Sequence, residues 1–366
     1  MPTTLSFNGV QLASVLLSRL LSRDISSVED QSSAANTFPD DVRLARPSGR
    51  TPLTDELIAM SKSRKDNSQR RKRIRFSGPN LPELELASCN EIICLKTPCM
   101  LEQFSCLTVS GCSMPQIIES KAPNLSTTNF EGNLVHLSLG QPMNVTSLDL
   151  QCSDETNFLC YAITKLPYVV PNLETLSLSS DSEMVTTPMV ASKFVHLKHL
   201  QICLGGGLSE GYDFLSLVSF LDASPVLEAF VLGVYQSEMN FDSVFGNTTH
   251  MRQMPEHKHH SLKDLMIFGF CSARSFVELT CHILESATNL ESVNLDCVFD
   301  ENDEENTVRC SVTSDRKPGD CFPLNNEMIL EANKGIMAID RYMASKVPSV
   351  VKLDVRGPCS RCHSIF

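Results

Sequence analysis

The sequence lacks several features that mark membrane proteins and nucleic-acid-binding proteins. It contains no tryptophan, and no apolar run approaches the roughly 18–20 residues that cross a bilayer. Positive charge is scarce, because 31 Lys and Arg residues stand against 43 Asp and Glu residues, a formal net charge of −12. Phosphate groups repel such an acidic chain, so we expect neither a nucleic acid nor a membrane surface as its partner.

Catalytic and cofactor-binding patterns are also missing. There is no Ser, His and Asp set and no nucleophile elbow. Gly205–Gly207 form a glycine run, but no Lys-Ser or Lys-Thr follows, so a phosphate-binding loop is excluded. Fifteen cysteines without a secretory signal are typical of a reducing compartment. The sequence therefore predicts a non-enzymatic protein of the nucleus, the cytoplasm or both, with no catalytic residue, no cofactor and no metal.

What the sequence does contain is a recurring Leu-x-x-Leu-x-Leu pattern, mostly at intervals of roughly 20–35 residues. Its eleven copies begin at Leu81, Phe104, Leu125, Leu134, Val145, Leu173, Leu197, Leu227, Leu262, Leu290 and Val350. The fourth and sixth positions lie two apart on a short strand, so both point to one face and bury themselves against neighbouring copies. Over residues 79–366 we predict an α/β leucine-rich-repeat solenoid with irregular repeats, parallel strands on its concave side and helices or loops outside.

Residues 1–78 do not share the repeat, and their Ser, Pro, Arg and Asp content predicts a poorly structured N-terminal tail. Apolar residues at helical spacing between Leu12 and Leu21 indicate either a transit peptide or a short amphipathic helix that docks on the repeats. A basic cluster that includes Arg70, Arg71, Lys72 and Arg73 indicates either a nuclear import signal or a solvated linker.

Two helices are expected in the second half of the chain. The first begins after a cap at Ser272 or Ser275 and keeps Glu278 outside. Its core face consists of Val277, Thr280, Ile283 and Leu284. The second helix runs from about residue 325 to 345, where an apolar stripe predicts that it caps the open end of the solenoid. The acidic residues 300–320 between them are expected to form an exposed loop.

Cys359, Cys362 and His363 match the C-x-x-C-H pattern of c-type haem attachment. A haem so close to the C-terminus would lack a domain to enclose it. Zinc suits thiolate and imidazole better, but a structural zinc site needs a fourth ligand, and the sequence offers none nearby. We therefore interpret the trio as a turn after the last strand.

A histidine group precedes the strand expected near Leu265. It comprises His250, His257, His259 and His260, with Glu256 among them. Imidazoles this close together can bind a metal. However, His259 and His260 are adjacent and do not readily face one ion on an extended segment. We interpret the group as a surface turn.

Several stretches resemble the plant F-box and leucine-rich-repeat proteins that are numerous in grasses. They are residues 104–125, 251–256 (Met-Arg-Gln-Met-Pro-Glu), 261–263, 269–284, 289–296, 347–353 and 358–363 (Pro-Cys-Ser-Arg-Cys-His). In that family the F-box binds the Skp adaptor of a cullin-based ubiquitin ligase, and the repeats hold a target protein. Here Phe38–Asp41 is the nearest match to the opening of an F-box, and the segment Arg46–Pro52 that follows would break its helices.

Together these observations predict a protein–protein interaction module that binds an unknown protein on its repeat surface. The alternative is a substrate-recognition subunit of a Skp–cullin–F-box ubiquitin ligase, which would reach the Skp adaptor through a divergent N-terminus. Candidate contacts are the strand residues that alternate with the core positions and so point outward. They are Thr175, Ser177, His199, Gln201, Asp264, Met266, Asn294, Asp296, Lys352, Asp354 and Arg356.

Overall fold

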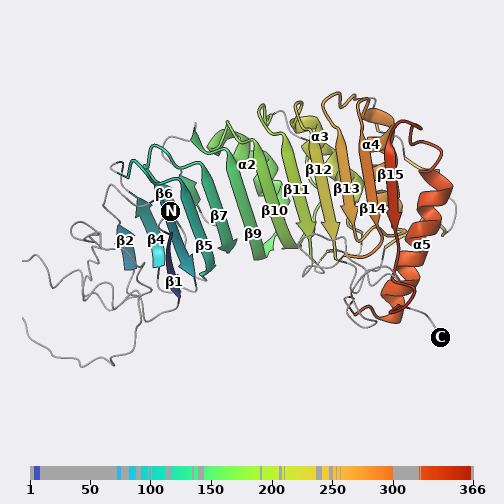
Figure 1. The fold of residues 1–366 in the computed structure, drawn as a ribbon, viewed down its shortest axis with the longest axis horizontal. Helices are drawn as coiled ribbons and strands as arrows, with labels where there is room; N and C mark the ends of the chain where they lie inside the picture. Colours follow the sequence, from blue (N-terminus) through green and yellow to red (C-terminus); the bar gives the residue numbers. More distant parts are fainter. Residues whose placement is uncertain are drawn as a thin grey trace, which may run out of the picture. The chain divides into compact units, whose positions relative to one another are not determined.

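The structure is a computed structural model that divides the chain into two compact units, Met1–Thr146 and Ser147–Phe366. It describes residues 4–8, 72–75, 82–87, 92–97, 99, 101–112, 117–133, 136–138, 144–189, 192–205, 208–209, 211–235, 241–246, 250–252, 254–255, 257–299, 321 and 323–363. The expected N-terminal helix, the nearest F-box match and the acidic loop at 300–320 lie outside these residues. Both units are built on parallel strands (Figure 1).

The first unit contains two parallel sheets. One sheet has the order β1 (Thr4–Asn8), β3 (Glu83–Ala87), β5 (Cys106–Cys112) and β7 (Thr127–Gly132). The other has the order β2 (Lys72–Arg75), β4 (Ile92–Thr97), β6 (Ile117–Ser120) and β8 (His136–Ser138). Each repeat therefore gives one strand to each sheet. The core contains Leu84, Leu107 and Phe130 from the first sheet and Leu95 and Ile118 from the second, all at most 2% exposed.

This arrangement differs from the sequence prediction in two ways. β1 and β2 precede residue 79, where we expected a poorly structured tail, yet they pair in parallel with β3 and β4. In addition, the pattern copy that begins at Leu134 puts Leu137 into β8, in the second sheet, whereas the other copies lie in strands of the main series. A short apolar run satisfies the same pattern on either strand of a two-stranded repeat, so spacing alone cannot separate them.

The asparagines that precede several strands have a specific role. The side-chain amide of Asn124 donates a hydrogen bond to the carbonyl oxygen of Glu102 at 2.5 Å, and that of Asn144 donates to Pro123. In the second unit the amide of Asn289 donates to the carbonyl of His260 at 2.7 Å. Each bond satisfies a turn carbonyl of the preceding repeat, which ties consecutive turns together.

In its described residues, the second unit contributes seven parallel strands to one sheet, in chain order. They are β9 (Ser147–Thr156), β10 (Thr175–Ser182), β11 (His199–Leu204), β12 (Ala229–Val234), β13 (Asp264–Phe268), β14 (Ser292–Asp296) and β15 (Lys352–Arg356). Its helical segments are α2 (Phe158–Val169), the 3₁₀ turn η2 (Phe214–Leu217), α3 (Val218–Ala223), α4 (Arg274–Ser286) and α5 (Asn326–Tyr342). Within this unit α2, α3 and α4 lie behind the strands in Figure 1.

The strands pair in an unshifted register from β10 to β15, so the pattern residues form continuous buried rows. The fourth positions form the row Leu148, Leu176, Leu200, Phe230, Leu265, Val293 and Leu353. All but Leu353 are at most 1% exposed. The observed α/β repeat fold thus follows from the spacing of the leucines.

Helix α4 lies where the sequence predicts it, but its surroundings differ. Its N-cap is Ala273, which makes no side-chain cap. Ser272 instead contacts Ser243, and Ser275 accepts a hydrogen bond from the backbone of Phe214. Glu278, which we expected outside, is buried. The connection that leads into β13 covers the side of α4 that carries Glu278, because Arg252 in this connection contacts Glu278.

Helix α5 also forms, and Asn325 caps it: the side chain of Asn325 accepts a hydrogen bond from the backbone N–H of Met328. It does not cover the last strand completely. Gly335 lies so close to the carbonyl of Phe270 that an added Cβ would come within 2.7 Å of it. α5 thus packs against the segment after β13, while Val350 and Val355 remain 88% and 37% exposed. The expected end cap is therefore partial.

Candidate functional site

The seven strands of the second unit present one face away from α2, α3 and α4 (Figure 1). Because the strands are in register, the residues between the buried positions line up in three rows, which we call the outward face. The first row is Ser147, Thr175, His199, Ala229, Asp264, Ser292 and Lys352; the second is Asp149, Ser177, Gln201, Val231, Met266, Asn294 and Asp354; the third is Gln151, Ser179, Cys203, Gly233, Phe268, Asp296 and Arg356.

All eleven contact residues suggested by the sequence belong to these rows. Period-two alternation is sufficient to place them, since the register adds no shift between strands β10 and β15. Ten of them are exposed or half-buried. Whether they contact a partner stays a prediction.

Asp296 is the exception, and its assignment as an accessible contact is corrected. Its side chain is only 4% exposed, and its carboxylate accepts a hydrogen bond from the backbone N–H of Val298 at 2.8 Å. Asp296 is the last residue of β14, so the chain turns over it. An aspartate at a strand end frequently bonds the backbone two residues on.

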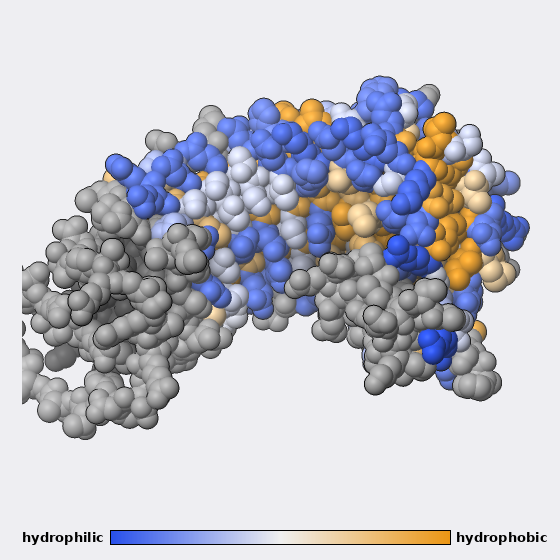
Figure 2. Space-filling view, viewed as in Figure 1, coloured by the Kyte–Doolittle hydropathy of each residue, from blue (hydrophilic) through white to orange (hydrophobic). Residues whose placement is uncertain are grey.

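The centre of the outward face is apolar, which the sequence reasoning largely missed. Val231, Met266 and Phe268 are half-buried neighbours in the second and third rows. Phe299 lies over Gly233, where an added Cβ would meet its ring at 2.8 Å. Figure 2 shows apolar surface in this part of the face. The sequence does indicate this apolar centre, because β12 and β13 are almost continuously apolar and so carry apolar residues at their outward positions as well.

A row of charges borders the face at the start of the strands. Glu174 pairs with Lys198 at 2.8 Å, and Glu228 pairs with Lys263 at 2.6 Å. The hydrogen bonds within these pairs lower the pKa values of both glutamates and raise those of both lysines. Because the charges alternate along the row and satisfy one another, this border does not present a strong field of either sign.

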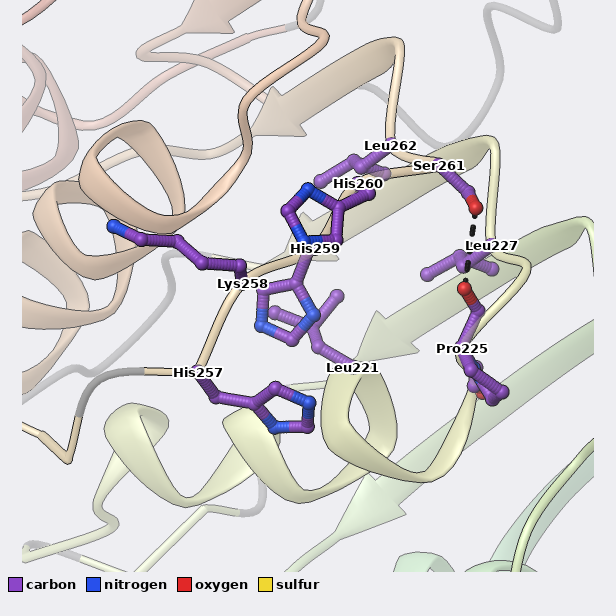
Figure 3. Close-up of a pocket in the computed structure, with 10 residues that line it drawn as sticks. Leu221, Pro225, Leu227, His257, Lys258, His259, His260, Ser261 and Leu262 are labelled. Atoms are coloured by element: carbon purple, nitrogen blue, oxygen red, sulfur yellow. Dashed lines mark hydrogen bonds between the residues drawn. The ribbon is translucent and has the colours of Figure 1, made fainter.

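A small cavity of about 150 Å³ lies beside the connection from β12 to β13 (Figure 3). Leu221, Leu227, His257 and His259 are among its lining residues. The cavity is smaller than the roughly 300–1,000 Å³ of typical ligand pockets. It accommodates a few water molecules rather than a cofactor.

The histidines around this cavity only partly fit the predicted surface turn. His257 Nδ1 lies 2.5 Å from Asp222 Oδ1, and His259 Nε2 lies 3.7 Å from the same oxygen. His260 points elsewhere and contacts Thr288 at 3.0 Å, so the two adjacent histidines do diverge. His259, however, is buried, and this burial lowers its pKa to about 4. Its imidazole is therefore neutral at physiological pH.

Of the four residues predicted as a nuclear import signal, Lys72 and Arg73 begin strand β2. Arg70 and Arg71 lie outside the described residues. The pairing of β2 with β4 is parallel, and the register shifts between Lys72 and Arg73. The import signal stays a prediction.

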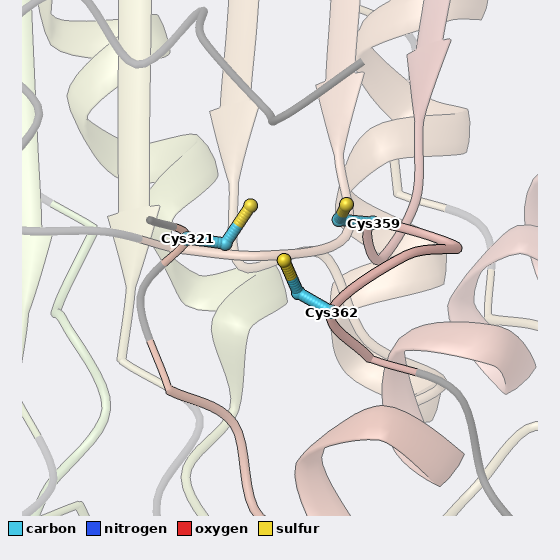
Figure 4. Close-up of side chains that lie close together, drawn as sticks. All are labelled: Cys321, Cys359 and Cys362. Atoms are coloured by element: carbon cyan, nitrogen blue, oxygen red, sulfur yellow. The ribbon is translucent and has the colours of Figure 1, made fainter. Parts of the chain in front are cut away.

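The terminal Cys and His trio has a neighbour that the sequence did not reveal. Cys321, which precedes α5, brings its sulfur to those of Cys359 and Cys362, and all three sulfurs lie within 4.8 Å of one another (Figure 4). In the described ranges no other group of three His, Cys, Asp or Glu residues gathers its ligand atoms so closely. Sequence spacing cannot find this contact, because the path of the chain around α5 creates it.

None of the helices in the described part of the chain combines the length and the hydropathy of a membrane span. No curated protein and no solved structure matches the sequence. A family profile does match residues 76–360, a range that contains every strand from β3 to β15. Domains of this kind are typically non-enzymatic interaction domains, and the chain belongs to the leucine-rich-repeat family described as At1g61320/AtMIF1, LRR domain.

Proposed function

We propose that this chain is a non-enzymatic binding module, a solenoid of leucine-rich repeats that holds one protein partner against its outward face. The observation that carries the proposal is the unshifted register from β10 to β15, which joins single outward residues into a continuous surface. Stacked repeats use such extended surfaces to bind other proteins.

The composition of the outward face indicates how a partner is held. Val231, Met266 and Phe268 supply a half-buried apolar centre, and polar residues such as Gln201 and Asn294 lie beside it. An apolar centre within a polar surround is the usual anatomy of a protein interface. Since the bordering charges are already paired, affinity should come mainly from apolar and hydrogen-bonding contacts. Binding should therefore weaken only slightly between low and physiological salt.

The test is affinity capture of partner proteins with this chain as bait, attached so that the outward face stays accessible. Met266→Lys places a charge in the apolar centre. Tyr168→Ala, at a 74% exposed position on α2, serves as the control on the helical side. Proteins that the wild-type chain and Tyr168→Ala enrich, and that Met266→Lys loses at least tenfold, identify partners of the outward face. Thermal melting confirms that both variants are folded. If both variants enrich the same proteins equally, the outward face is not the binding site.

The second candidate function is that of a substrate-recognition subunit of a Skp–cullin–F-box ubiquitin ligase. It is supported by the resemblance of stretches such as residues 251–256 and 358–363 to F-box and leucine-rich-repeat proteins. A pull-down of a purified Skp adaptor with the full chain, and with a chain that starts at Ser77, tests it. Because this truncation also removes β1 and β2, thermal melting must first show that the shorter chain is folded. Adaptor binding that is lost on truncation supports the ligase subunit. Absence of binding by both forms leaves the stand-alone module.

A further inference from the structure

The sulfurs of Cys321, Cys359 and Cys362 converge from two segments that are distant in sequence. Cys321 lies in the connection between β14 and α5, whereas Cys359 and Cys362 follow β15. In Figure 4 the three side chains point into one shared space. Their sulfurs lie within 4.8 Å of one another, Cys359 is 6% exposed, and the other two are half-buried.

We propose that these three cysteines bind a zinc ion that ties the connection before α5 to the segment after β15. A tetrahedral zinc ion with Zn–S bonds of about 2.3 Å holds its sulfurs about 3.8 Å apart. Sulfurs within 4.8 Å of one another exceed this spacing by no more than about 1 Å, which rotations about the Cα–Cβ bonds supply. The spacing of Cys359 and Cys362 is the C-x-x-C that zinc sites commonly use.

The local backbone prepares the C-x-x-C pair for a metal. The backbone N–H of His363 donates to the carbonyl of Cys359 at 2.8 Å, which closes a turn around Arg361. In return, Nδ1 of His363 accepts a hydrogen bond from the N–H of Cys359 at 3.2 Å. These two bonds hold Cys359 and Cys362 on the same side of the turn. His363 thus positions the turn, and a zinc ion bound by the three sulfurs would take the fourth ligand that it needs from solvent, at the half-buried side of Cys362.

A disulfide explains the arrangement less well than a metal does. A disulfide joins two sulfurs at about 2.05 Å and leaves the third thiol beside it without a role. A thiophilic divalent ion uses all three sulfurs at once. The ion would also close the loop from Cys321 to Cys359, which contains α5, and so restrict the unfolded chain in the way that a cross-link does.

The first test is a cobalt titration of the full, untagged chain purified under reducing conditions. Cobalt(II) reports its ligands directly, since thiolate ligands give an intense charge-transfer absorption in the near ultraviolet. We expect this absorption to saturate at one cobalt per chain and to disappear when zinc is added. Because it uses only the wild-type protein, the result does not depend on the folding of a variant. If saturating cobalt produces no thiolate absorption, the proposal is wrong.

The second test assigns the ligands. Cys321→Ser removes the sequence-distant sulfur, and Cys160→Ser is a control at another half-buried cysteine, on α2. We expect about one zinc per chain by elemental analysis in the wild type and in Cys160→Ser, and at least a tenfold loss in Cys321→Ser. Zinc should raise the melting temperature of the wild type but not of Cys321→Ser. Full zinc content in Cys321→Ser would overturn the three-cysteine assignment.

Discussion

The side chain of Arg252 links three segments of the second unit, and its removal tests how the longer repeats are held. Its Nη1 and Nη2 atoms lie 2.7 and 2.8 Å from the carboxylate of Asp213, which precedes η2. Its Nε and Nη2 atoms lie 2.7 and 2.6 Å from Oε2 of Glu278 on α4. The hydrogen bonds that its guanidinium donates to Asp213 and Glu278 raise the pKa of Arg252. We choose Arg252→Met, which keeps the aliphatic stem and removes the guanidinium.

The expected loss of folding stability in Arg252→Met follows from the unequal exposure of Arg252 and Glu278. The side chain of Glu278 is 0% exposed, whereas that of Arg252 is 50% exposed. Removing one partner of a fully buried pair costs about 3–5 kcal/mol, because the other charge stays buried without compensation. Water that enters from the exposed side of Arg252 lowers this penalty. We therefore expect a loss of about 2–3 kcal/mol, or a decrease in melting temperature of roughly 5–10 °C.

The assay is urea denaturation of the wild type, Arg252→Met, Glu278→Leu and the double variant. In the double variant no buried charge is left, so the two losses should not add, and a coupling of at least about 1.5 kcal/mol is expected. Lys165→Met, at an exposed position on α2, is the control and should change stability by no more than about 0.5 kcal/mol. A loss below about 0.5 kcal/mol for Arg252→Met, or strict additivity, would refute the buried-carboxylate argument.

Three further predictions concern other parts of the chain. Gly269 has a φ of +70°, and an added Cβ would overlap the carbonyl oxygen of Val234. Gly269→Ala should therefore lower the stability measured by urea denaturation by at least about 2 kcal/mol. Gly211 has open space around it, so the control Gly211→Ala should be nearly neutral. The pKa of His259 is about 4 in the folded state and about 6.5 in the unfolded state, so the stability it confers is complete above pH 6.5 and is lost as the pH falls towards 4. His259→Gln should remove about 2–3 kcal/mol of this acid sensitivity, measured as the difference between wild-type and variant stability at pH 7 and pH 4. Alanine at residues 70–73 should lower the nuclear fraction of a fluorescent fusion if the basic cluster is an import signal, and an unchanged distribution would exclude that role.

The repeat positions could be predicted because the pattern itself is the cause of the fold. A leucine at the fourth and sixth position must be buried, and burial is possible only if neighbouring copies stack in register. The two-stranded repeats of the first unit could not be predicted in the same way. Their second strands, such as Ile117–Ser120, are only three to six residues long, which is too short to show a period of their own.

The outward face illustrates the same limit at the level of single residues. Alternation places Thr175 and Gln201 correctly, because it depends only on local strand geometry. It fails for Asp296, whose burial depends on the turn after β14. Helical spacing fails in the same way for Glu278 on α4, whose burial depends on Arg252 in a separate connection. Cys321 was missed for the same reason as Glu278, because its neighbours Cys359 and Cys362 lie in a segment that is distant in sequence. In each of these cases a contact with another segment decides the environment of the residue.

The long connections of the second unit explain why such polar contacts occur where they do. Equivalent positions of β10 and β11 are 24 residues apart, those of β12 and β13 are 35 apart, and those of β14 and β15 are 60 apart. A short connection is held by the buried leucines at its two ends, whereas a long one loses more chain entropy on folding than those leucines alone offset. The connection into β13 is fixed by Arg252 to Asp213 and Glu278. By the proposal above, the connection into β15 is fixed at Cys321 by a metal ion. Zinc removal should therefore accelerate amide hydrogen exchange selectively in α5 and β15. Equal acceleration across all seven strands would contradict the proposal that the metal ion fixes only the connection into β15.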